Sequence, residues 1–307
     1  MKSAMIYGAS GFIGKHLVKG LSKLGIDVIS VVPEDTDEFI VDELDKYSTH
    51  IIICSLNKVA TELANKVCQN IDITYFLAWD GLSKDGLNDY QRQINNVTYM
   101  LNLMKESVKL GARKFIGSGS ITQQELYREE GRTYLTDKHK YYRVAQQACE
   151  DMGNALAKEL GISFIWPKLT NVYGVGEDSP RLINTMIRTL LKNENYPTSP
   201  GEQLYDFIYI DDAVNIYIEL AKNHQLSNPV IIGSGKPQKL KDYLKIVEQE
   251  VAGTGKTEFG KFDYTGMYYL DRELNATRLL KEIDYEIKND FKSGVDKTIS
   301  WIRNEEC

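Results

Sequence analysis

Short apolar runs alternate with longer segments of helical periodicity through the first half of the chain. The apolar runs predict β-strands at residues 4–7, 28–32, 51–54, 74–78, 114–117 and 163–166. The segments between them predict α-helices at residues 12–24, 58–70, 90–110 and 141–160, most of which stop near a glycine. Because strands that are buried on both faces read as continuous apolar runs, this alternation indicates an α/β fold with a doubly wound parallel sheet.

The pattern becomes less regular after about residue 173, where prolines and glycines interrupt it. Helices are still predicted at residues 180–192, 212–222 and 240–251, and strands at residues 206–210 and 230–232. We therefore predict a larger domain at residues 1–175 and a smaller α/β lobe at residues 176–307. The smaller lobe is not expected to be independent of the first, and some segments are expected to cross between the two.

Composition and charge exclude several classes of protein. The 307 residues carry a net charge of −6 with acidic and basic side chains interspersed, so neither nucleic acid nor a membrane surface is expected as a partner. No apolar stretch is long enough for a signal peptide or a spanning helix. The 4 cysteines and 4 histidines are scattered, which predicts no metal site, no disulfide framework and a cytoplasmic location.

A glycine-rich segment, GASGFIG at residues 8–14, joins the first predicted strand to the first predicted helix. Gly8 would allow the tight turn, Gly11 the close approach of a pyrophosphate, and Gly14 the close packing of helix on strand. The first N–H groups of the helix would then face the phosphates. The segment predicts a dinucleotide-binding Rossmann domain in which the cofactor contacts Gly8, Ser10, Gly11, Phe12, Ile13 and Gly14.

Acidic residues follow the second predicted strand. Glu34 or Asp35 could accept hydrogen bonds from the ribose hydroxyls of the adenosine, and either would repel a 2′-phosphate. Pro33 intervenes and leaves the register open. The sequence therefore favours NAD as the cofactor without excluding NADP.

Four further motifs follow in order along the chain. They are NNVTYMLNLM at residues 95–104, KFIGSGSI at 114–121, WPKLTNVYGVG at 166–176 and GEQLYDFIYIDDA at 201–213. Together with the GxxGxxG spacing, they resemble the motifs of the extended short-chain dehydrogenase/reductase family. This family contains the NAD-dependent epimerases, dehydratases and reductases of nucleotide sugars, and the nearest resemblance within it is to 4-ketoreductases of the abequose synthase type. The resemblance implies a Rossmann domain, a small substrate-binding lobe and a nucleotide-linked sugar as the substrate.

The resemblance also implies the catalytic residues. Ser120 matches the family's catalytic serine or threonine, and Tyr142 with Gln146 matches its Tyr-x-x-x-Lys pair, with glutamine in place of lysine. The two residues lie one helical turn apart on the same helix face. An amide at position 146 can still bind the nicotinamide ribose, but it cannot supply the charge that lowers the pKa of a neighbouring phenol. Because a protonated tyrosine is already in the state that reduces a ketone, ketone reduction tolerates the change better than alcohol oxidation.

Two alternatives concern this pair. Tyr141 could be the functional phenol, although Ala145 then occupies the position of the lysine. Lys138 lies one turn before Tyr142 and could restore the missing charge. Ile121 and the threonine after it replace the Asp-Glu pair of the family's dehydratases, which disfavours elimination of water.

Further site residues follow from the same resemblance. Ala78 and Lys168 are expected at the cofactor, with Lys168 in place of a frequent arginine. Asn171, Arg181 and Tyr205 are expected at the substrate. Tyr205 occupies the position of an arginine that binds the diphosphate in many members, and Arg181, Lys236 or Arg272 could neutralise the phosphates in its place.

These observations support three hypotheses. The first is an NAD(P)-dependent oxidoreductase that reduces a 4-keto sugar nucleotide during the biosynthesis of glycan precursors, and the second is a nucleotide-sugar 4-epimerase. The third, motivated by Gln146 and Tyr205, is a dinucleotide-binding protein without catalytic activity. The resemblance also implies a homodimer formed through the helices at residues 90–110 and 141–160.

Overall fold

The computed structural model describes residues 1–66, 70–83, 85–127, 139–222 and 224–305. The chain divides into two compact units. The first comprises residues 1–168 and 217–230, and the second comprises residues 169–216 and 231–307. The division thus falls at residue 168, and one later segment returns to the first unit.

The first unit is built on a six-stranded sheet. Its strands are β1 (Ser3–Tyr7), β2 (Asp27–Val32), β3 (His50–Ile53), β4 (Ile73–Phe76), β5 (Lys114–Ile116) and β7 (Ser163–Ile165). Their spatial order is β3-β2-β1-β4-β5-β7, and all neighbouring strands run parallel. This is the strand order of a doubly wound dinucleotide-binding sheet, so the predicted fold class is confirmed.

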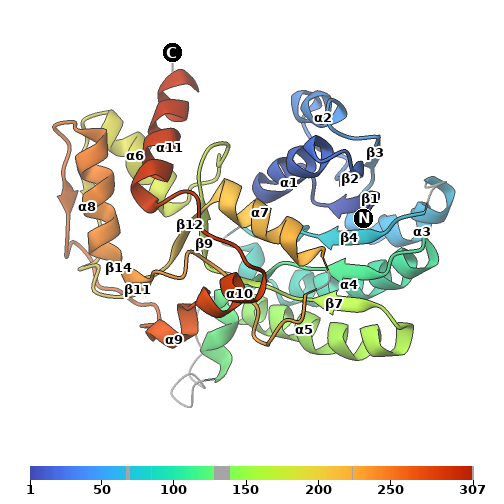
Figure 1. The fold of residues 1–307 in the computed structure, drawn as a ribbon. Helices are drawn as coiled ribbons and strands as arrows, with labels where there is room; N and C mark the ends of the chain where they lie inside the picture. The colour runs from blue at the N-terminus through green and yellow to red at the C-terminus, as the bar shows by residue number, and fades with distance from the viewer. Residues whose placement is uncertain (67–69, 84, 128–138, 223, 306–307) are drawn as a thin grey trace. The chain divides into compact units, whose positions relative to one another are not determined.

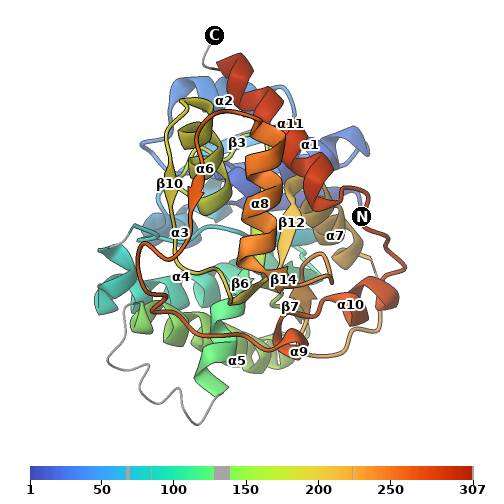
Figure 2. The ribbon, with the colours of Figure 1, turned by 90° about the vertical axis from the view of Figure 1, so that its left-hand side faces the viewer.

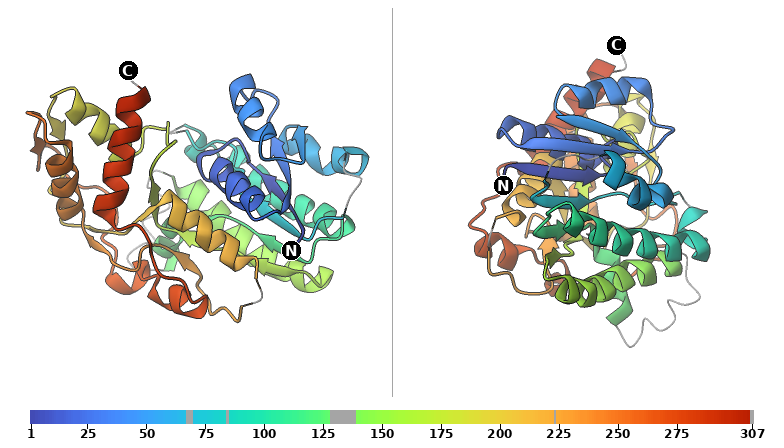
Figure 3. Two further views of the ribbon diagram at one scale, coloured as in Figure 1. Left: turned by 45° about the horizontal axis from the view of Figure 1, so that its top comes forward. Right: turned by 90° about the vertical axis from the view of Figure 1, so that its right-hand side faces the viewer.

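Helices cover both faces of this sheet. Helices α1 (Phe12–Lys23) and α2 (Glu38–Asp45) lie on one face, and α3 (Leu56–Lys66), α4 (Tyr90–Lys109) and α5 (Lys140–Leu160) lie on the other (Figures 1 and 3). The core beneath α3, α4 and α5 includes stacked rings, with 6.1 Å between the ring centroids of Phe76 and Phe115. Apolar burial on both faces explains why the strands read as continuous apolar runs.

Short elements complete the first unit: β6 (Gly119–Ser120), η1 (Gly86–Asn88) and η2 (Ile121–Tyr127), with β8 (Lys168–Leu169) at the boundary. Helix α7 (Ile210–Leu220) begins in the second unit and ends in the first. Two contacts hold its last turn there. The hydroxyl of Tyr75 donates to the carbonyl of Tyr217 at 3.3 Å, and Nζ of the buried Lys114 donates to the carbonyls of Leu220 and Ala221, both at 3.1 Å. The lysine therefore caps the carbonyl end of the helix.

The second unit pairs short strands and packs helices against them. Its strands form the pairs β9 (Asn171–Tyr173) with β12 (Phe207–Tyr209), β11 (Leu204–Tyr205) with β14 (Gln238–Lys239), and β10 (Tyr196–Pro197) with β15 (Thr257–Glu258), while β13 is Ile231–Ile232. Helices α6 (Leu182–Leu191), α8 (Leu240–Val251) and α11 (Phe291–Glu305) pack against one another (Figure 2), and α9 (Asp271–Leu274) and α10 (Thr277–Glu282) are short. Aromatic rings pack together in this unit, with 4.6 Å between the centroids of Tyr243 and Phe291. No helix among the described residues is long and apolar enough to span a bilayer.

Candidate active site

The glycine turn between β1 and α1 has a geometry that larger residues would not allow. Gly8 has a φ of +82°, and a Cβ there would lie 2.7 Å from the backbone nitrogen of Ala78. A Cβ on Gly14 would lie 2.1 Å from the carbonyl oxygen of Gly8. The first helical bond of α1 runs from the N–H of Lys15 to the carbonyl of Gly11 at 2.9 Å. The N–H groups of residues 12–14 precede that bond and remain available for an anion.

A cavity of about 580 Å³ opens beside this turn, at the carboxyl ends of the strands. Of the residues predicted to contact the cofactor, Gly8, Ser10, Gly11 and Ala78 line this cavity. The others are not among its lining residues: Phe12, Ile13, Gly14, Glu34, Tyr142, Gln146 and Lys168. The remaining walls come from the ends of β2, β3 and β4 and from α4. The cavity volume and the free N–H groups fit a dinucleotide.

The two candidate acids after β2 have different surroundings. Asp35 lines the cavity. Glu34 instead pairs with Lys58 of α3, with 3.1 Å between the carboxylate oxygen and Nζ, and the hydrogen bond from that lysine lowers the pKa of Glu34. Of these two acids, Asp35 is therefore the one in position to meet a ligand in the cavity.

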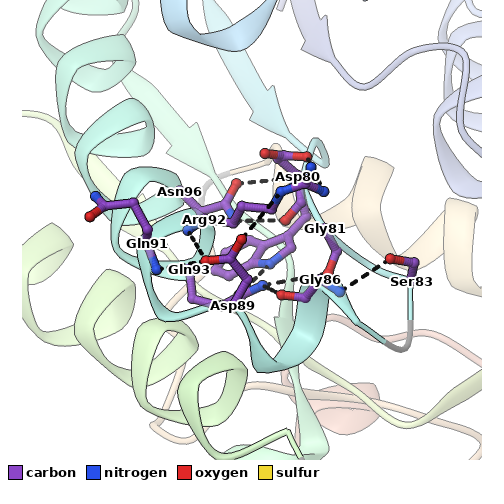
Figure 4. Close-up of polar contacts among 10 residues, drawn as sticks. Asp80, Gly81, Ser83, Gly86, Asp89, Gln91, Arg92, Gln93 and Asn96 are labelled. Carbon is purple, nitrogen blue, oxygen red and sulfur yellow. Dashed lines mark hydrogen bonds and ion pairs between the residues drawn. The ribbon is translucent and has the colours of Figure 1, made fainter.

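The loop after β4 forms one wall of the cavity and is fixed to α4 (Figure 4). Asn96 holds the backbone of Asp80 at both ends, accepting from its N–H and donating to its carbonyl, each at 2.9 Å. Gln93 accepts from Nε1 of Trp79 at 2.9 Å and donates to the carbonyl of Gly86 at 2.9 Å. Gln93 and Asn96 are both buried, so the loop has a defined conformation.

Tyr142 lies at the start of α5 and packs against this wall. Its ring contacts that of Trp79 edge to face, with 5.6 Å between centroids and an interplanar angle of 82°. Gln146, one turn further on, is only 2% exposed, and its Oε1 has no hydrogen-bond partner among the described residues. An unsatisfied buried amide oxygen costs about 1 to 3 kcal/mol, so a ligand hydroxyl that donates to it fits this site.

Two other residues, Tyr141 and Lys138, are alternatives for this pair, and the structure describes only Tyr141. Tyr141 is exposed and contacts Tyr90, with 6.1 Å between the ring centroids. Its ring contact is thus with Tyr90 of α4, whereas Tyr142 contacts Trp79, which lines the cavity. Lys138 lies outside the described residues.

Ser120 belongs to β6 and is connected to α5 by a polar network. Its Oγ lies 2.8 Å from Oγ1 of Thr122, and its N–H donates to Oε1 of Gln123 at 3.0 Å. Nε2 of the buried Gln123 donates to Glu150 at 2.9 Å, and Glu150 pairs with Lys168 at 3.1 Å. The predicted cofactor contact Lys168 is thus a buried partner of α5.

A second link joins the same segments. Arg143, next to Tyr142 in the sequence, pairs with Glu125 of η2 at 2.9 Å between nitrogen and oxygen, and both side chains are buried. Polar contacts therefore connect the segment that carries Ser120 to α5 at two positions. These are Arg143 and Glu150, which precede and follow Gln146 in the sequence. Removing one partner of such a contact costs more than an exposed ion pair would.

The predicted substrate residues belong to the second unit. Nδ2 of Asn171 donates to the carbonyl of Asp206 at 3.2 Å, and the ring of Tyr205 stacks on Phe207 with 5.6 Å between centroids. Arg181 precedes α6 and is exposed. Lys236 and Arg272 are exposed as well. These assignments stay predictions.

Sequence reasoning did not single out Trp79, Gln93 or Gln123. Trp79 follows the carboxyl end of β4, so the rule that ligands bind beyond strand ends could have found it. Gln93 and Gln123 carry no such signal, because their roles depend on contacts between segments. Among the described residues, no cluster of three metal-ligating side chains occurs.

Comparison with known proteins identifies the class. Residues 4–233 match the model of the NAD dependent epimerase/dehydratase family, and the chain belongs to that family. CDP-abequose synthase of Salmonella typhimurium is 26% identical, over 96% of both chains.

Two solved structures share the fold. UDP-glucose 4-epimerase from Thermotoga maritima, with UDP-glucose, has a TM-score of 0.83 at 20% identity and covers 99% of this chain and 100% of its own. A variant of UDP-glucuronic acid 4-epimerase from Bacillus cereus, in complex with a fluorinated sugar nucleotide and NAD, has a TM-score of 0.79 at 18% identity, with 99% of both chains covered.

Proposed function

We propose that this protein is an NAD(P)-dependent reductase of a 4-keto sugar nucleotide. The observation that supports the proposal is the contact between the rings of Tyr142 and Trp79, because Trp79 lines the cavity that begins at the glycine turn. Family membership and the similarity to CDP-abequose synthase support the substrate class.

The residues of the first unit have distinct roles in this reaction. Bound NADH or NADPH would supply the hydride to the carbonyl carbon. Tyr142 donates a proton to the carbonyl oxygen, and Ser120 donates a hydrogen bond to the same oxygen. Gln146 would accept a hydrogen bond from the nicotinamide ribose through its Oε1, which has no partner among the described residues. No base is required in this direction, so the reaction does not need the charge of a lysine at position 146.

The surroundings of the cavity support a preference for NADH. Asp35 lines the cavity, and its carboxylate would repel a 2′-phosphate. The nearby cation Lys58 is paired with Glu34. We expect Asp35→Asn to reduce the preference for NADH, and Glu34→Ala to improve NADPH binding by releasing Lys58. Asp42→Asn, an exposed change on α2, is the matched control. Titrating each variant with NADH and with NADPH gives two dissociation constants, and their ratio is the cofactor preference of that variant.

The test of the function is consumption of NADH and NADPH, measured separately, with a panel of nucleotide-linked 4-keto-6-deoxy sugars. We expect turnover with at least one of them, and a loss of about 10²- to 10⁴-fold in Tyr142→Phe, the range typical of general acid catalysis. Tyr141→Phe is the matched control and should retain activity.

Other results would distinguish the alternatives. Interconversion of 4-epimers without net cofactor consumption would indicate an epimerase. Cofactor binding without any turnover, together with no effect of Tyr142→Phe, would indicate a binding protein. Either result would replace the reductase proposal.

A further inference from the structure

Trp79 contacts three parts of the first unit: the cavity, α4 and α5. It follows the carboxyl end of β4, where ligands bind in folds of this type. Its side chain lines the cavity next to Ala78, and its ring contacts that of Tyr142. A change at this one residue can therefore affect both the cofactor cavity and the phenol.

The orientation of the indole is fixed by Gln93 of α4. Nε1 of Trp79 donates to Oε1 of Gln93 at 2.9 Å, and Gln93 is 1% exposed. The other end of the same amide donates to the carbonyl of Gly86 at 2.9 Å, so the amide cannot rotate without losing a bond on each side. A buried and fully directed amide of this kind specifies one position for its partner.

Because the indole is fixed, its contact with Tyr142 restricts the positions that the phenol ring can take. An edge-to-face arrangement is the favourable geometry for two aromatic rings, and the observed interplanar angle is 82°. Tyr142 lies in the first turn of α5, where a helix receives less support than in its middle. Gln146 has no charge with which to orient the phenol, so packing against Trp79 carries more of the orientation here than it would beside a lysine.

We propose that Trp79 is a positioning residue for Tyr142, held in place by Gln93. The proposal rests on the proposed function in so far as Tyr142 is the proton donor. It predicts that the identity of residue 79 controls the rate of the chemical step more than it controls substrate affinity, because a proton donor displaced by about 1 Å loses efficiency steeply.

The experiment compares Trp79→Leu, Trp79→Phe and Gln93→Leu, with Trp301→Phe of α11 as the matched control. We expect Trp79→Leu to lower kcat about tenfold or more, with less than a threefold change in KM or in the dissociation constant of NADH. Trp79→Phe keeps an aromatic ring and should retain at least a third of the wild-type kcat. Gln93→Leu should fall between the two, because the indole stays but loses its fixed orientation. Trp301→Phe should have no effect.

A second measurement does not depend on activity. In NMR spectra of protein with isotope-labelled tyrosine rings, the Tyr142 resonance is identified by its loss in Tyr142→Phe. We expect it to shift in Trp79→Leu, because the ring current of the indole is removed, and to stay in place in Trp301→Phe. This readout also shows whether Trp79→Leu remains folded, since the other tyrosine resonances then keep their positions.

The outcomes separate the two proposals. A wild-type protein without turnover would contradict the proposed function, and the Tyr142 resonance would still decide the positioning role. An unmoved resonance in Trp79→Leu, or an unchanged kcat in an active enzyme, would overturn the role of Trp79 alone. A loss of kcat that merely follows a loss of NADH binding would overturn it as well, since Trp79 would then be a cofactor contact only.

Discussion

The backbone N–H of Ser120 donates a hydrogen bond to Oε1 of Gln123 at 3.0 Å, and Gln123 is fully buried. The other end of the same amide donates to Glu150 of α5 at 2.9 Å, and Glu150 is paired with Lys168. An amide suits this position because it accepts on one side and donates on the other. The strand that carries Ser120 is thereby connected to the helix that carries Tyr142.

Replacing Gln123 by glutamate should make the enzyme sensitive to pH. The variant keeps the acceptor for Ser120 but places a second carboxylate against Glu150, and two adjacent carboxyls share a proton with one pKa raised. At low pH the shared proton restores the hydrogen bond, and as pH rises the pair ionises and repels. We expect kcat of Gln123→Glu to fall about tenfold or more from pH 5 to 8, relative to the wild type.

A double variant provides the control for this prediction. In Gln123→Glu with Glu150→Gln, the donor and the acceptor exchange places and the net charge beside Lys168 is unchanged, so activity near pH 8 should recover. Gln124→Glu adds the same charge one residue away, outside the network, and should behave as the wild type. A pH profile of Gln123→Glu that coincides with that of Gln124→Glu would contradict the role of this hydrogen bond.

Introducing a lysine by Gln146→Lys should shift the pH profile of the reaction. A cation one helical turn from Tyr142 lowers the pKa of the phenol by about 1 to 3 units, which favours the tyrosinate that acts as a base. Because both directions share one transition state, we expect the pH profiles of kcat/KM for alcohol oxidation and for ketone reduction to move together, toward lower pH by about 1 to 3 units. Initial rates in both directions across pH check this, with Gln146→Met as an uncharged control of similar size. A pH profile of Gln146→Lys that coincides with that of the wild type would show that residue 146 acts only through cofactor binding.

The parts of the fold that sequence predicts are those whose signal is local. The strands of the first unit are apolar on both faces, and the glycine turn needs residues without a Cβ, so both are visible in a short window of sequence. Helix α2 was not predicted, because it is short and Leu44 is its only buried residue. Two-residue strands such as β10 and β15 exist only through their pairing. The predicted boundary at 175 could not reveal that Lys114 binds the end of α7 in the first unit.

The candidate site also combines local features, which the sequence predicts, with contacts between distant segments, which it does not. Tyr142 and Gln146 are one turn apart on one helix, so their spacing predicts that they share a helix face, and the family resemblance implies their joint role. The contacts of Trp79 with Tyr142, and of Gln123 with Glu150, join segments that are far apart in the sequence. They depend on how α5 packs against its neighbours, and no spacing rule describes that.

Asp206 should make the stability of the second unit depend on pH. Burial raises the pKa of its carboxyl to about 6 from the ordinary value of 3.8, although the N–H groups of Ser234 and Gly235 donate to it. Between about pH 4 and 6 the folded state therefore binds more protons than the unfolded state, and the free energy of unfolding decreases as pH rises. The expected decrease from this residue is on the order of 2 to 3 kcal/mol.

The measurement is urea unfolding between about pH 4 and 7, compared for wild type and Asp206→Asn. We expect a flatter pH dependence in Asp206→Asn, whatever its absolute stability, because an amide nitrogen facing Gly235 has a cost of its own. Asp211→Asn, at an exposed position on α7, should retain the wild-type slope. Parallel curves for wild type and Asp206→Asn would mean that this carboxyl has no raised pKa.

The helices α4 and α5 expose apolar side chains that a partner would cover. Ile94 of α4 is 55% exposed and Val144 of α5 is 44% exposed, and the exposed rings of Tyr90 and Tyr141 contact each other beside them. A contiguous apolar surface on two neighbouring helices is typical of an interface, and we predict a homodimer through this face. Analytical ultracentrifugation should show a dimer for the wild type and a monomer for Ile94→Asp with Val144→Asp, because a buried carboxylate without a partner is strongly unfavourable. Phe39→Asp, which changes an exposed apolar residue on α2, should stay dimeric, and a wild-type monomer at micromolar concentration would show that this surface has another use.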